Sequence, residues 1–207
     1  NLSKSLAHTP TLFHVDVVPT EFFLAIPEAT SERRNYVPIG WLEPPTIPSN
    51  QLIILPGASK EIFAVMTSRM HMSWLSYIGG RLKSDYRYSP GIVYNTFPYP
   101  SMSDKQRAEI ETLAERVLSA RAGYPSSSLS DLYDPDLMPP ELYRAHKALD
   151  AAVDKLYRAA PFVDDRERVE HPTSPVGCST RLAGPRSPEM AALIDQVGQL
   201  EECRVVE

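Results

Sequence analysis

Hydrophobic positions in the middle of the sequence follow a helical period. Between residues 59 and 78, apolar residues recur at intervals of three and four, which is typical of an amphipathic helix. They are Ile62, Val65, Met66, Met70, Trp74, Tyr77 and Ile78. Ser59 can cap the amino end of this helix, and Gly79 and Gly80 can end it. The pattern predicts one helix over residues 59–78.

Short apolar runs separated by prolines precede this helix. Residues 11–27 contain two such runs split by Pro19, and residues 35–42 and 51–56 contain one each. The loop between the last two, "EPPTIPSN", is stiffened by its prolines. Runs of this length bounded by turn residues are typical of strands. We therefore expect a small mixed sheet against which the helix packs.

After the helix, the period changes to two. Lys83, Asp85 and Arg87 occupy every second position, with Tyr86 and Tyr88 between and after them. Side chains two apart in an extended strand point the same way, about 6.5–7 Å from each other. The alternation predicts one extended strand with a charged face, held to the core by the tyrosines on its other face.

The remainder of the chain has a helical texture. Ser103 and Gln106 have the spacing of a capping box for a helix that ends near Gly123. A second amphipathic helix begins at Pro139–Pro140 and stops before Pro161. Two amphipathic helices joined in this way are expected to pack as an antiparallel pair.

These patterns together predict an α+β fold in three segments. Residues 1–100 form a small-sheet domain with a packed helix, and residues 101–160 form an α-helical hairpin. Residues 161–207 are polar and rich in proline, which predicts a linker followed by a short terminal helix. The first residue is Asn rather than Met, so we expect the chain to be a piece of a longer protein.

Charge is distributed unevenly along the 207 residues. The net charge of −5, taken alone, argues against nucleic-acid binding. However, residues 31–100 carry seven Lys or Arg against four Asp or Glu, a net of +3, and residues 101–207 carry thirteen against nineteen, a net of −6. The middle of the chain is therefore mildly basic, although less so than a free-standing DNA-binding domain.

Catalytic patterns are missing from the sequence. It has no glycine-rich phosphate loop after a strand, no acidic-Pro-Pro-aromatic tetrapeptide, and no histidines at metal-ligand spacing. Cys178 and Cys203 form no metal-binding pair and fit free thiols in a reducing cytoplasm. No run approaches the roughly 18 apolar residues of a membrane span, and no signal peptide is present. We expect a cytoplasmic, non-catalytic segment that binds no cofactor or metal itself and no membrane.

The alternating charges at Lys83, Asp85 and Arg87 match the chemistry of base readout. Lys and Arg donate to guanine O6 and N7, and Asp accepts from the cytosine amino group, so Lys83 with Asp85 could read one G·C pair. A carboxylate facing DNA is unfavourable unless it meets a base donor, which favours specificity over general adhesion. The alternative is an ordinary solvated strand with lateral charge pairs.

Two further segments carry candidate base or phosphate contacts. Asn50 and Gln51 follow the proline-stiffened loop, and either amide can bond adenine N6 and N7. Residues 31–34, "SERR", could combine phosphate contacts with a base contact. Each segment also fits an ordinary turn, because Asn and Ser are common turn residues.

The order of these motifs resembles one protein family. The motifs are "SERRNYVPIGWL", "SNQ", "SRMHMSWLSYIGGRLKSDYRYSPGIVYNTFPYP" and "LYDPDLMPPELYRAHKALDAAVDKLYR", within residues 25–160. This arrangement resembles the C-terminal part of class I S-adenosylmethionine-dependent DNA methyltransferases, including the MmeI-like type IIL (IIG) restriction–modification enzymes. The resemblance implies a DNA target recognition domain to about residue 100, followed by the family's C-terminal helical domain.

The resemblance also implies partners and recognition positions. An upstream domain of the same polypeptide would use S-adenosylmethionine to methylate adenine N6 in double-stranded DNA, and type IIL members would add a Mg²⁺-dependent nuclease. The implied DNA-binding positions are Lys83, Ser84, Asp85, Arg87, Asn50, Gln51, Ser31, Glu32 and Arg33, with Arg81 in the Gly-Arg-Leu strand entry.

Two rival hypotheses remain open from the sequence. The first is a protein–protein scaffold or specificity-subunit module, whose paired helices would dock a separate catalytic subunit. The second is a methyltransferase without a nuclease, which this segment cannot distinguish from a type IIL enzyme.

Overall fold

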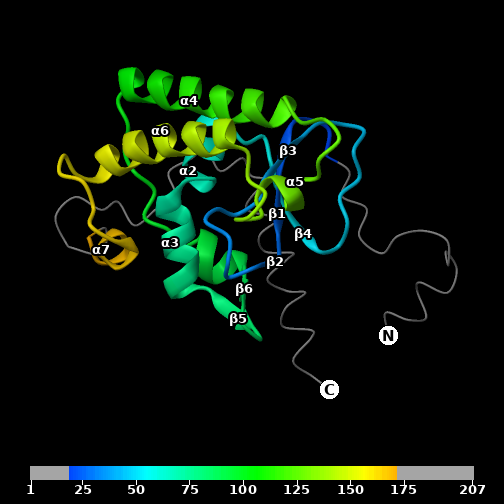
Figure 1. Ribbon diagram of the computed structural model, residues 1–207, viewed down its shortest axis with the longest axis horizontal. Coiled ribbons are helices and arrows are strands. Elements are labelled where there is room, and N and C mark those ends of the chain that lie inside the picture. Colours follow the sequence, from blue (N-terminus) through cyan, green and yellow to red (C-terminus); the bar gives the residue numbers. More distant parts are fainter. Residues whose placement is uncertain (1–18, 172–207) are drawn as a thin grey trace, which may run out of the picture.

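A central strand organises the larger of two sheets in the computed structural model, which describes residues 19–171. Strands β1 (Phe23–Pro27), β3 (Gly40–Leu42) and β4 (Leu52–Pro56) form an antiparallel sheet in the order β3-β1-β4 (Figure 1). Four consecutive residues of β1, from Phe23 to Ile26, are buried. Both faces of this strand are therefore covered, which explains its uninterrupted apolar sequence.

The second sheet carries the segment with alternating charges. It consists of β2 (Ala29–Thr30), β6 (Asp85–Arg87) and β5 (Gly80–Leu82) in the order β2-β6-β5, again antiparallel. The prediction of an α+β fold with small sheets is confirmed, with two antiparallel sheets among the described residues. Because β1 leads directly into β2, the chain passes from one sheet to the other at Glu28.

The prediction of one helix over residues 59–78 is wrong. Two helices occupy this segment, α2 (Lys60–Met66) and α3 (Arg69–Ile78). At the break, the Ser68 hydroxyl donates to the Val65 carbonyl at 2.7 Å, and a carboxylate oxygen of Asp150 accepts from the Arg69 amide at 2.7 Å. These contacts satisfy groups that a continuous helix would have paired within itself, so α3 starts anew.

Helices α4 (Asp104–Ala122) and α6 (Pro140–Tyr157) form the predicted antiparallel pair, with the short helix α5 (Leu129–Leu132) between them. The capping box of Ser103 and Gln106 is present, as predicted. Figure 1 shows α4 and α6 side by side, and α4 also packs against α2. Their buried apolar residues belong to the same core as those of the larger sheet and α2.

Residues 161–171 differ from the predicted polar linker. Helix α7 (Asp165–Glu170) packs against α3, and its Val169 is buried. Ion pairs of Arg69 with Asp165 and of Arg168 with Asp154 hold it in place. Sequence reasoning missed this helix because these ion-pair partners, Asp154 and Arg69, lie 14 and 96 positions away. The predicted terminal helix, Cys178 and Cys203 lie outside the described residues.

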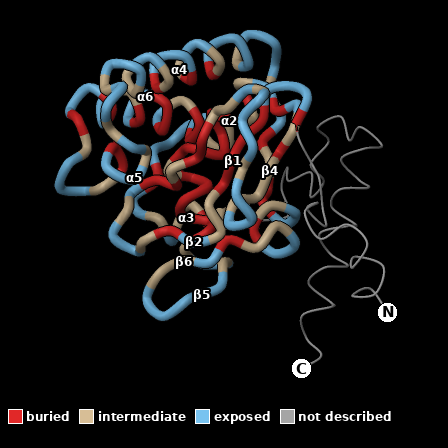
Figure 2. The backbone as a smooth tube through the Cα atoms, turned by 90° about the vertical axis from the view of Figure 1, so that its right-hand side faces the viewer, coloured by how far each residue is buried: buried red, intermediate tan, exposed pale blue. Residues whose placement is uncertain are grey.

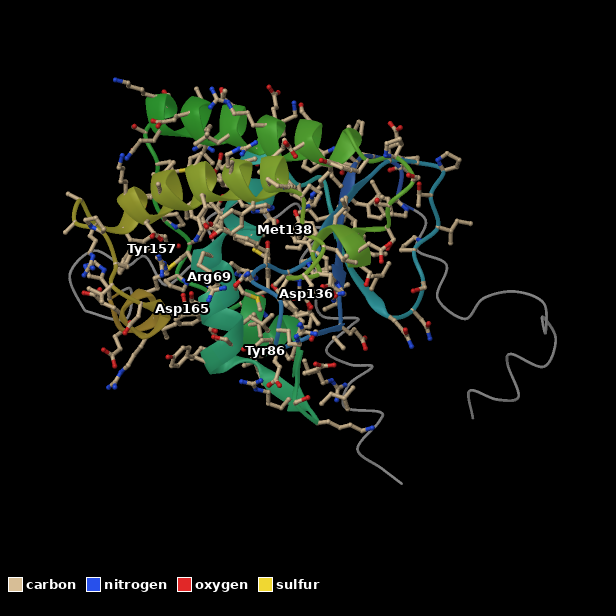
Figure 3. All side chains as sticks on the ribbon, viewed as in Figure 1. Arg69, Tyr86, Asp136, Met138, Tyr157 and Asp165 are labelled. Carbon is tan, nitrogen blue, oxygen red and sulfur yellow. The ribbon has the colours of Figure 1, made fainter. Side chains whose placement is uncertain are left out.

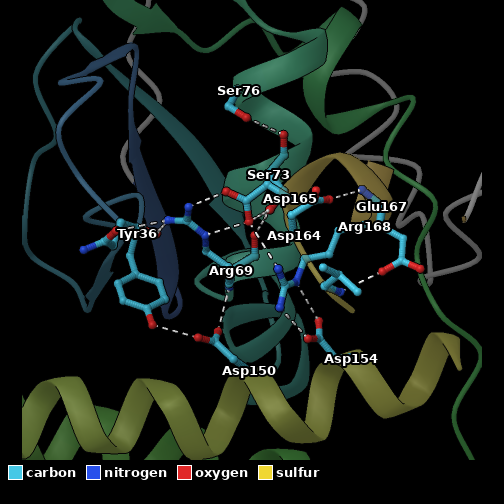
Figure 4. A network of polar contacts seen from close by, with 12 residues as sticks. Tyr36, Arg69, Ser73, Ser76, Asp150, Asp154, Asp164, Asp165, Glu167 and Arg168 are labelled. Carbon is cyan, nitrogen blue, oxygen red and sulfur yellow. Dashed lines mark hydrogen bonds and ion pairs between the residues drawn. The ribbon is translucent and has the colours of Figure 1, made fainter. Parts of the chain in front are cut away.

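A polar network underlies the junction of α3, α6 and α7. The Tyr36 hydroxyl donates to Asp150 at 2.7 Å, and the second carboxylate oxygen of Asp150 caps α3 (Figure 4). The Arg69 guanidinium reaches both Asp165 and the Asn35 carbonyl. The network joins the loop before β3 to helices α3, α6 and α7. These three helices and the larger sheet form the platform that carries the second sheet.

Exposure separates this platform from the hairpin of β5 and β6. Figure 2 shows the buried residues concentrated around β1, α2 and α3, while the connection between β5 and β6 projects from the body as an exposed loop. A π-helical turn, η1 (Pro90–Tyr94), follows the hairpin and packs on α3. Within residues 19–171, no helix is both long and apolar enough to cross a membrane.

Candidate nucleic-acid interface

The segment with alternating charges is a tight hairpin. Leu82 pairs with Asp85 and Arg81 pairs with Tyr86, which leaves Lys83 and Ser84 as a two-residue turn. The prediction of one extended strand that places Lys83 in line with Asp85 and Arg87 is therefore wrong. The chain reverses direction after Leu82, and Lys83 adopts a φ of 59°, in the left-handed region.

The hairpin nevertheless presents a charged face. Asp85 and Arg87 are two apart in β6 and point the same way, as predicted. Leu82 lies across from Asp85 on that face and is 56% exposed, a neighbour that sequence reasoning missed because it assumed no turn. Lys83 lies at the tip. The hairpin thus offers an ammonium group, a carboxylate and a guanidinium from its tip along one face.

A buried tyrosine anchors the base of the hairpin. Tyr88 is only 2% exposed, and its hydroxyl lies 3.1 Å from Nε2 of His71 on α3. His71 is itself fully buried, and burial lowers its pKa to about 3, so the ring is neutral. The predicted anchoring role is confirmed for Tyr88, and His71 is a packing residue beneath it. Tyr86, which is labelled in Figure 3, is half-buried.

Arg81 lies on the opposite face of the hairpin from Asp85. Its guanidinium donates to the Ser84 carbonyl at 2.8 Å and stacks 4.1 Å from the centre of the Tyr86 ring. It also faces the Glu32 carboxylate at 3.6 Å. In addition, the Glu32 amide donates to a carboxylate oxygen of Asp85 at 3.3 Å. The structure therefore brings the candidate residues of segment 31–33 against the hairpin.

The next arginines of this segment contact the chain before α6. Arg33 forms an ion pair with Asp136 at 2.6 Å, and this hydrogen bond raises the pKa of Arg33. Both side chains are mostly exposed, 64% and 70%. Arg34 donates to the Ser130 hydroxyl at 2.8 Å. The loop at 31–34 thus lies between the hairpin and the segment at 130–136, and Asp136 partly offsets the charge of Arg33.

The third candidate segment is the turn before β4. The Leu52 amide donates to the Ser49 carbonyl at 3.1 Å, and both Asn50 and Gln51 are exposed. The Gln51 carbonyl accepts from the Glu28 amide at 3.1 Å, and the Glu28 carbonyl accepts from the Tyr88 amide at 2.7 Å. Glu28 therefore links this turn to the base of the hairpin, and all three candidate segments adjoin strand β2.

The chemistry of this region is that of recognition. Within residues 19–171, no group of His, Cys, Asp or Glu is arranged to hold a metal ion. The exposed groups are hydrogen-bond donors and acceptors at the outer end of the β5–β6 hairpin, where β2 no longer pairs with β6. The major groove of B-DNA admits a two-stranded ribbon of this kind. The fold and the site together form an exposed charged hairpin on a packed base, an arrangement that suits a recognition module.

Comparison with known proteins agrees with this class. Residues 1–101 match the family described as MmeI, target recognition domain, and residues 102–174 match MmeI, C-terminal domain. The chain belongs to the MmeI family, and the resemblance noted from its motifs is confirmed.

A curated relative and a solved structure give the scale of the match. The chain is 39% identical over 168 residues to DNA methyltransferase A of Bacillus subtilis (strain 168), covering 81% of this chain and 19% of the relative. The structure of the type IIL restriction–modification enzyme MmeI in complex with DNA superposes with a TM-score of 0.77 at 42% identity, over 81% of this chain and 22% of that one. The chain therefore spans about a fifth of each relative.

Proposed function

We propose that this chain is the sequence-specific DNA recognition module of an adenine-N6 DNA methyltransferase or of a fused restriction–modification enzyme. In this proposal the hairpin of β5 and β6 enters the major groove, with Lys83 at its tip. The observation that carries it is the exposed, tyrosine-anchored hairpin that presents Lys83, Asp85 and Arg87 from a rigid platform. The match to the MmeI target recognition domain supports the same reading.

The charges of the hairpin determine which base pair it prefers. Lys83 can donate to guanine O6 or N7, and Asp85 can accept from the cytosine amino group. The carboxylate would otherwise face phosphate charge, so a base donor compensates for bringing it into the groove. The hairpin separates the two side chains by one residue around the turn, which suits a contact across one G·C pair or two adjacent pairs. Arg87 lies further from the tip, where it can donate to a base or a phosphate.

The other two segments contribute from the sides of the hairpin. Asn50 and Gln51 are exposed amides that can recognise adenine, and they adjoin the hairpin base through Glu28. Ser31 and Arg33 would contact the phosphate backbone of the DNA. Arg33 must then exchange its ion pair with Asp136 for one with a phosphate. The exchange requires the DNA to come into direct contact with the loop.

Catalysis would come from an upstream domain of the same polypeptide. That domain would bind S-adenosylmethionine and rotate the target adenine out of the base stack, and a fused nuclease would add a Mg²⁺ requirement. The names of the two relatives, a DNA methyltransferase and a restriction–modification enzyme, support this arrangement. The rival scaffold hypothesis loses support because α4 and α6 already bury their apolar faces on each other and on α2.

Exchange of the two hairpin charges should change the DNA sequence that is modified. In the full-length protein, we expect Lys83→Glu combined with Asp85→Arg to alter the base pair accepted at one position of the methylated motif, because donor and acceptor trade places. Glu keeps an unbranched side chain at the left-handed Lys83 position, so the turn should be retained. Sequencing of methylated adenines in cells that express the variant gives the motif.

The matched control reverses two exposed charges on α4, Glu109→Arg with Arg116→Glu, and should leave the motif unchanged. An unaltered motif in the hairpin variant, with normal methylation levels, would remove Lys83 and Asp85 from base readout.

A further inference from the structure

We infer that Arg81 is a positioning residue: it braces the Lys83–Ser84 turn and locks the loop at 31–33 to it, so that both recognition segments enter DNA as one rigid unit. This inference rests on the proposed function and assigns Arg81 a role different from direct contact with DNA. It derives from the hairpin register and from the contacts of a single guanidinium group.

The turn itself explains why a brace is needed. Two-residue hairpin turns usually contain Gly, Asn or Asp, which tolerate the left-handed region, but this turn consists of Lys83 and Ser84. Lys83 adopts a φ of 59° with a full side chain, a conformation that L-residues disfavour. The exposed tip is therefore not held by the intrinsic preference of its residues.

Arg81 supplies the missing constraint through three contacts. Nη1 of Arg81, on strand β5, donates to the carbonyl of Ser84, the second residue of the turn, at 2.8 Å. This hydrogen bond closes the turn. The guanidinium plane stacks 4.1 Å from the centre of the Tyr86 ring, on the cross-strand neighbour. Its charge faces Glu32 at 3.6 Å. A lysine has no planar group that could stack on the Tyr86 ring while the same side chain donates to the Ser84 carbonyl.

Glu32 extends the brace to the neighbouring loop. Its carboxylate faces Arg81 on one side of the hairpin, and its amide donates to Asp85 at 3.3 Å. The loop at 31–33 consequently holds both strands of the hairpin. The effects of substitutions at Glu32, Arg81 and Asp85 on discrimination between duplexes should therefore be non-additive, because Glu32 contacts both other residues.

The guanidinium is already committed to these partners. Arg81 points across its own hairpin, where it contacts the Ser84 carbonyl, the Tyr86 ring and the Glu32 carboxylate while its side chain stays 45% exposed. The geometry therefore places Lys83 at the tip of the hairpin and Arg81 on strand β5, further from the tip.

The test measures discrimination separately from general affinity. The full-length protein is titrated with a duplex that carries its methylated motif and with duplexes in which one base pair of the motif is changed, at several salt concentrations. Discrimination is the dissociation constant of a changed duplex divided by that of the motif duplex. We expect Arg81→Ala and Arg81→Lys to reduce this ratio about tenfold at the base pair that Lys83 contacts. The dependence of affinity on salt should not change. Arg116→Ala, an exposed arginine on α4, is the matched control.

Direct phosphate contact predicts a different result. Loss of one contact lowers the slope of log affinity against log salt by about 0.9 and weakens all duplexes alike. That outcome for Arg81→Ala would overturn the positioning role. Thermal unfolding of each variant, compared with wild type, shows whether the platform is intact, and Arg81→Lys provides the second, conservative variant.

A double-mutant cycle separates this inference from the proposed function. Lys83→Gly removes the tip side chain without backbone strain, since glycine accepts a φ of 59°. We expect Arg81→Ala to have no further effect on discrimination in the Lys83→Gly background. If Lys83→Gly leaves discrimination unchanged, the proposed function fails. If Lys83→Gly reduces it but Arg81→Ala does not, or if the two effects add, the positioning role alone is wrong.

Discussion

Replacement of Asp150 by alanine should lower the free energy of unfolding by about 3 kcal/mol or more, because a buried hydroxyl and a part-buried backbone amide lose their acceptor. Asp150 is 5% exposed and accepts from the Tyr36 hydroxyl and from the Arg69 amide, each at 2.7 Å. Burial raises the pKa of this carboxyl, although the two hydrogen bonds act against the increase. A loss of this size is a large fraction of the stability of an ordinary domain.

Urea unfolding of wild type, Asp150→Ala, Tyr36→Phe and the double variant measures the effect. Tyr36→Phe removes one of the two donors, so Asp150→Ala should cost less in that background. Lys155→Ala, also an alanine substitution on α6 but at an exposed position, should change stability by less than about 0.5 kcal/mol. A loss below about 1 kcal/mol for Asp150→Ala would show that the network does not hold α3 to α6.

Acid should destabilise the fold well above the range in which carboxylates titrate. Burial lowers the pKa of His71 to about 3, and burial with the charge of Arg121 lowers the pKa of His146 well below its ordinary value. Between the lowered pKa in the folded chain and the pKa of about 6.5 in the unfolded chain, each histidine binds a proton only when the chain is unfolded. Stability therefore falls as pH falls through this range. Each histidine should contribute about 2 kcal/mol of loss between pH 7 and pH 5. Asp150, whose pKa is raised, acts in the opposite direction once pH falls below its folded pKa.

Denaturant unfolding at pH 7, 6 and 5 checks this expectation. His71→Gln removes one titrating ring and should reduce the acid slope by about half, whereas Tyr88→Phe removes the hydroxyl partner of His71 but keeps the ring and should retain the slope. Equal slopes in wild type and His71→Gln would contradict a buried neutral His71.

Local signals in the sequence predicted much of the helical structure. The helix that starts after Ser103 and the one that starts at Pro140 are specified by caps and by apolar positions on one face, which act within a few residues. The burial of Tyr88 was also predictable, because Tyr88 alternates with the charged residues and so falls on the other face of the segment. Features of this kind require no knowledge of distant partners.

The hairpin turn could not be predicted by the same means. A two-residue turn preserves the alternation of side chains on either side of it, so a period of two fits both one long strand and a hairpin. The usual turn signal, Gly or Asn, is missing at Lys83 and Ser84. The sequence therefore predicted an exposed charged segment but placed Lys83 in line with Asp85 and Arg87 instead of in the turn.

Long-range partners account for the other differences. The break between α2 and α3 depends on Asp150, and helix α7 depends on Arg69 and Asp154, all distant in sequence. Likewise, the placement of Arg33 beside Asp136 and of Arg81 beside Glu32 follows from the packed fold. Sequence patterns gave candidate DNA-binding residues, whereas the structure separates tip, face and brace among them.

The central claim is that the β5–β6 hairpin reads bases in the major groove. Its most direct test removes single acceptor atoms from the DNA. Each guanine of the methylated motif is replaced in turn by 7-deazaguanine, which lacks N7, and binding of the full-length protein is measured for wild type and Lys83→Gly. We expect one replacement to weaken wild-type binding about tenfold and to have no effect on the binding of Lys83→Gly. Uniform wild-type binding to all the substituted duplexes, or the same loss in both proteins, would contradict it.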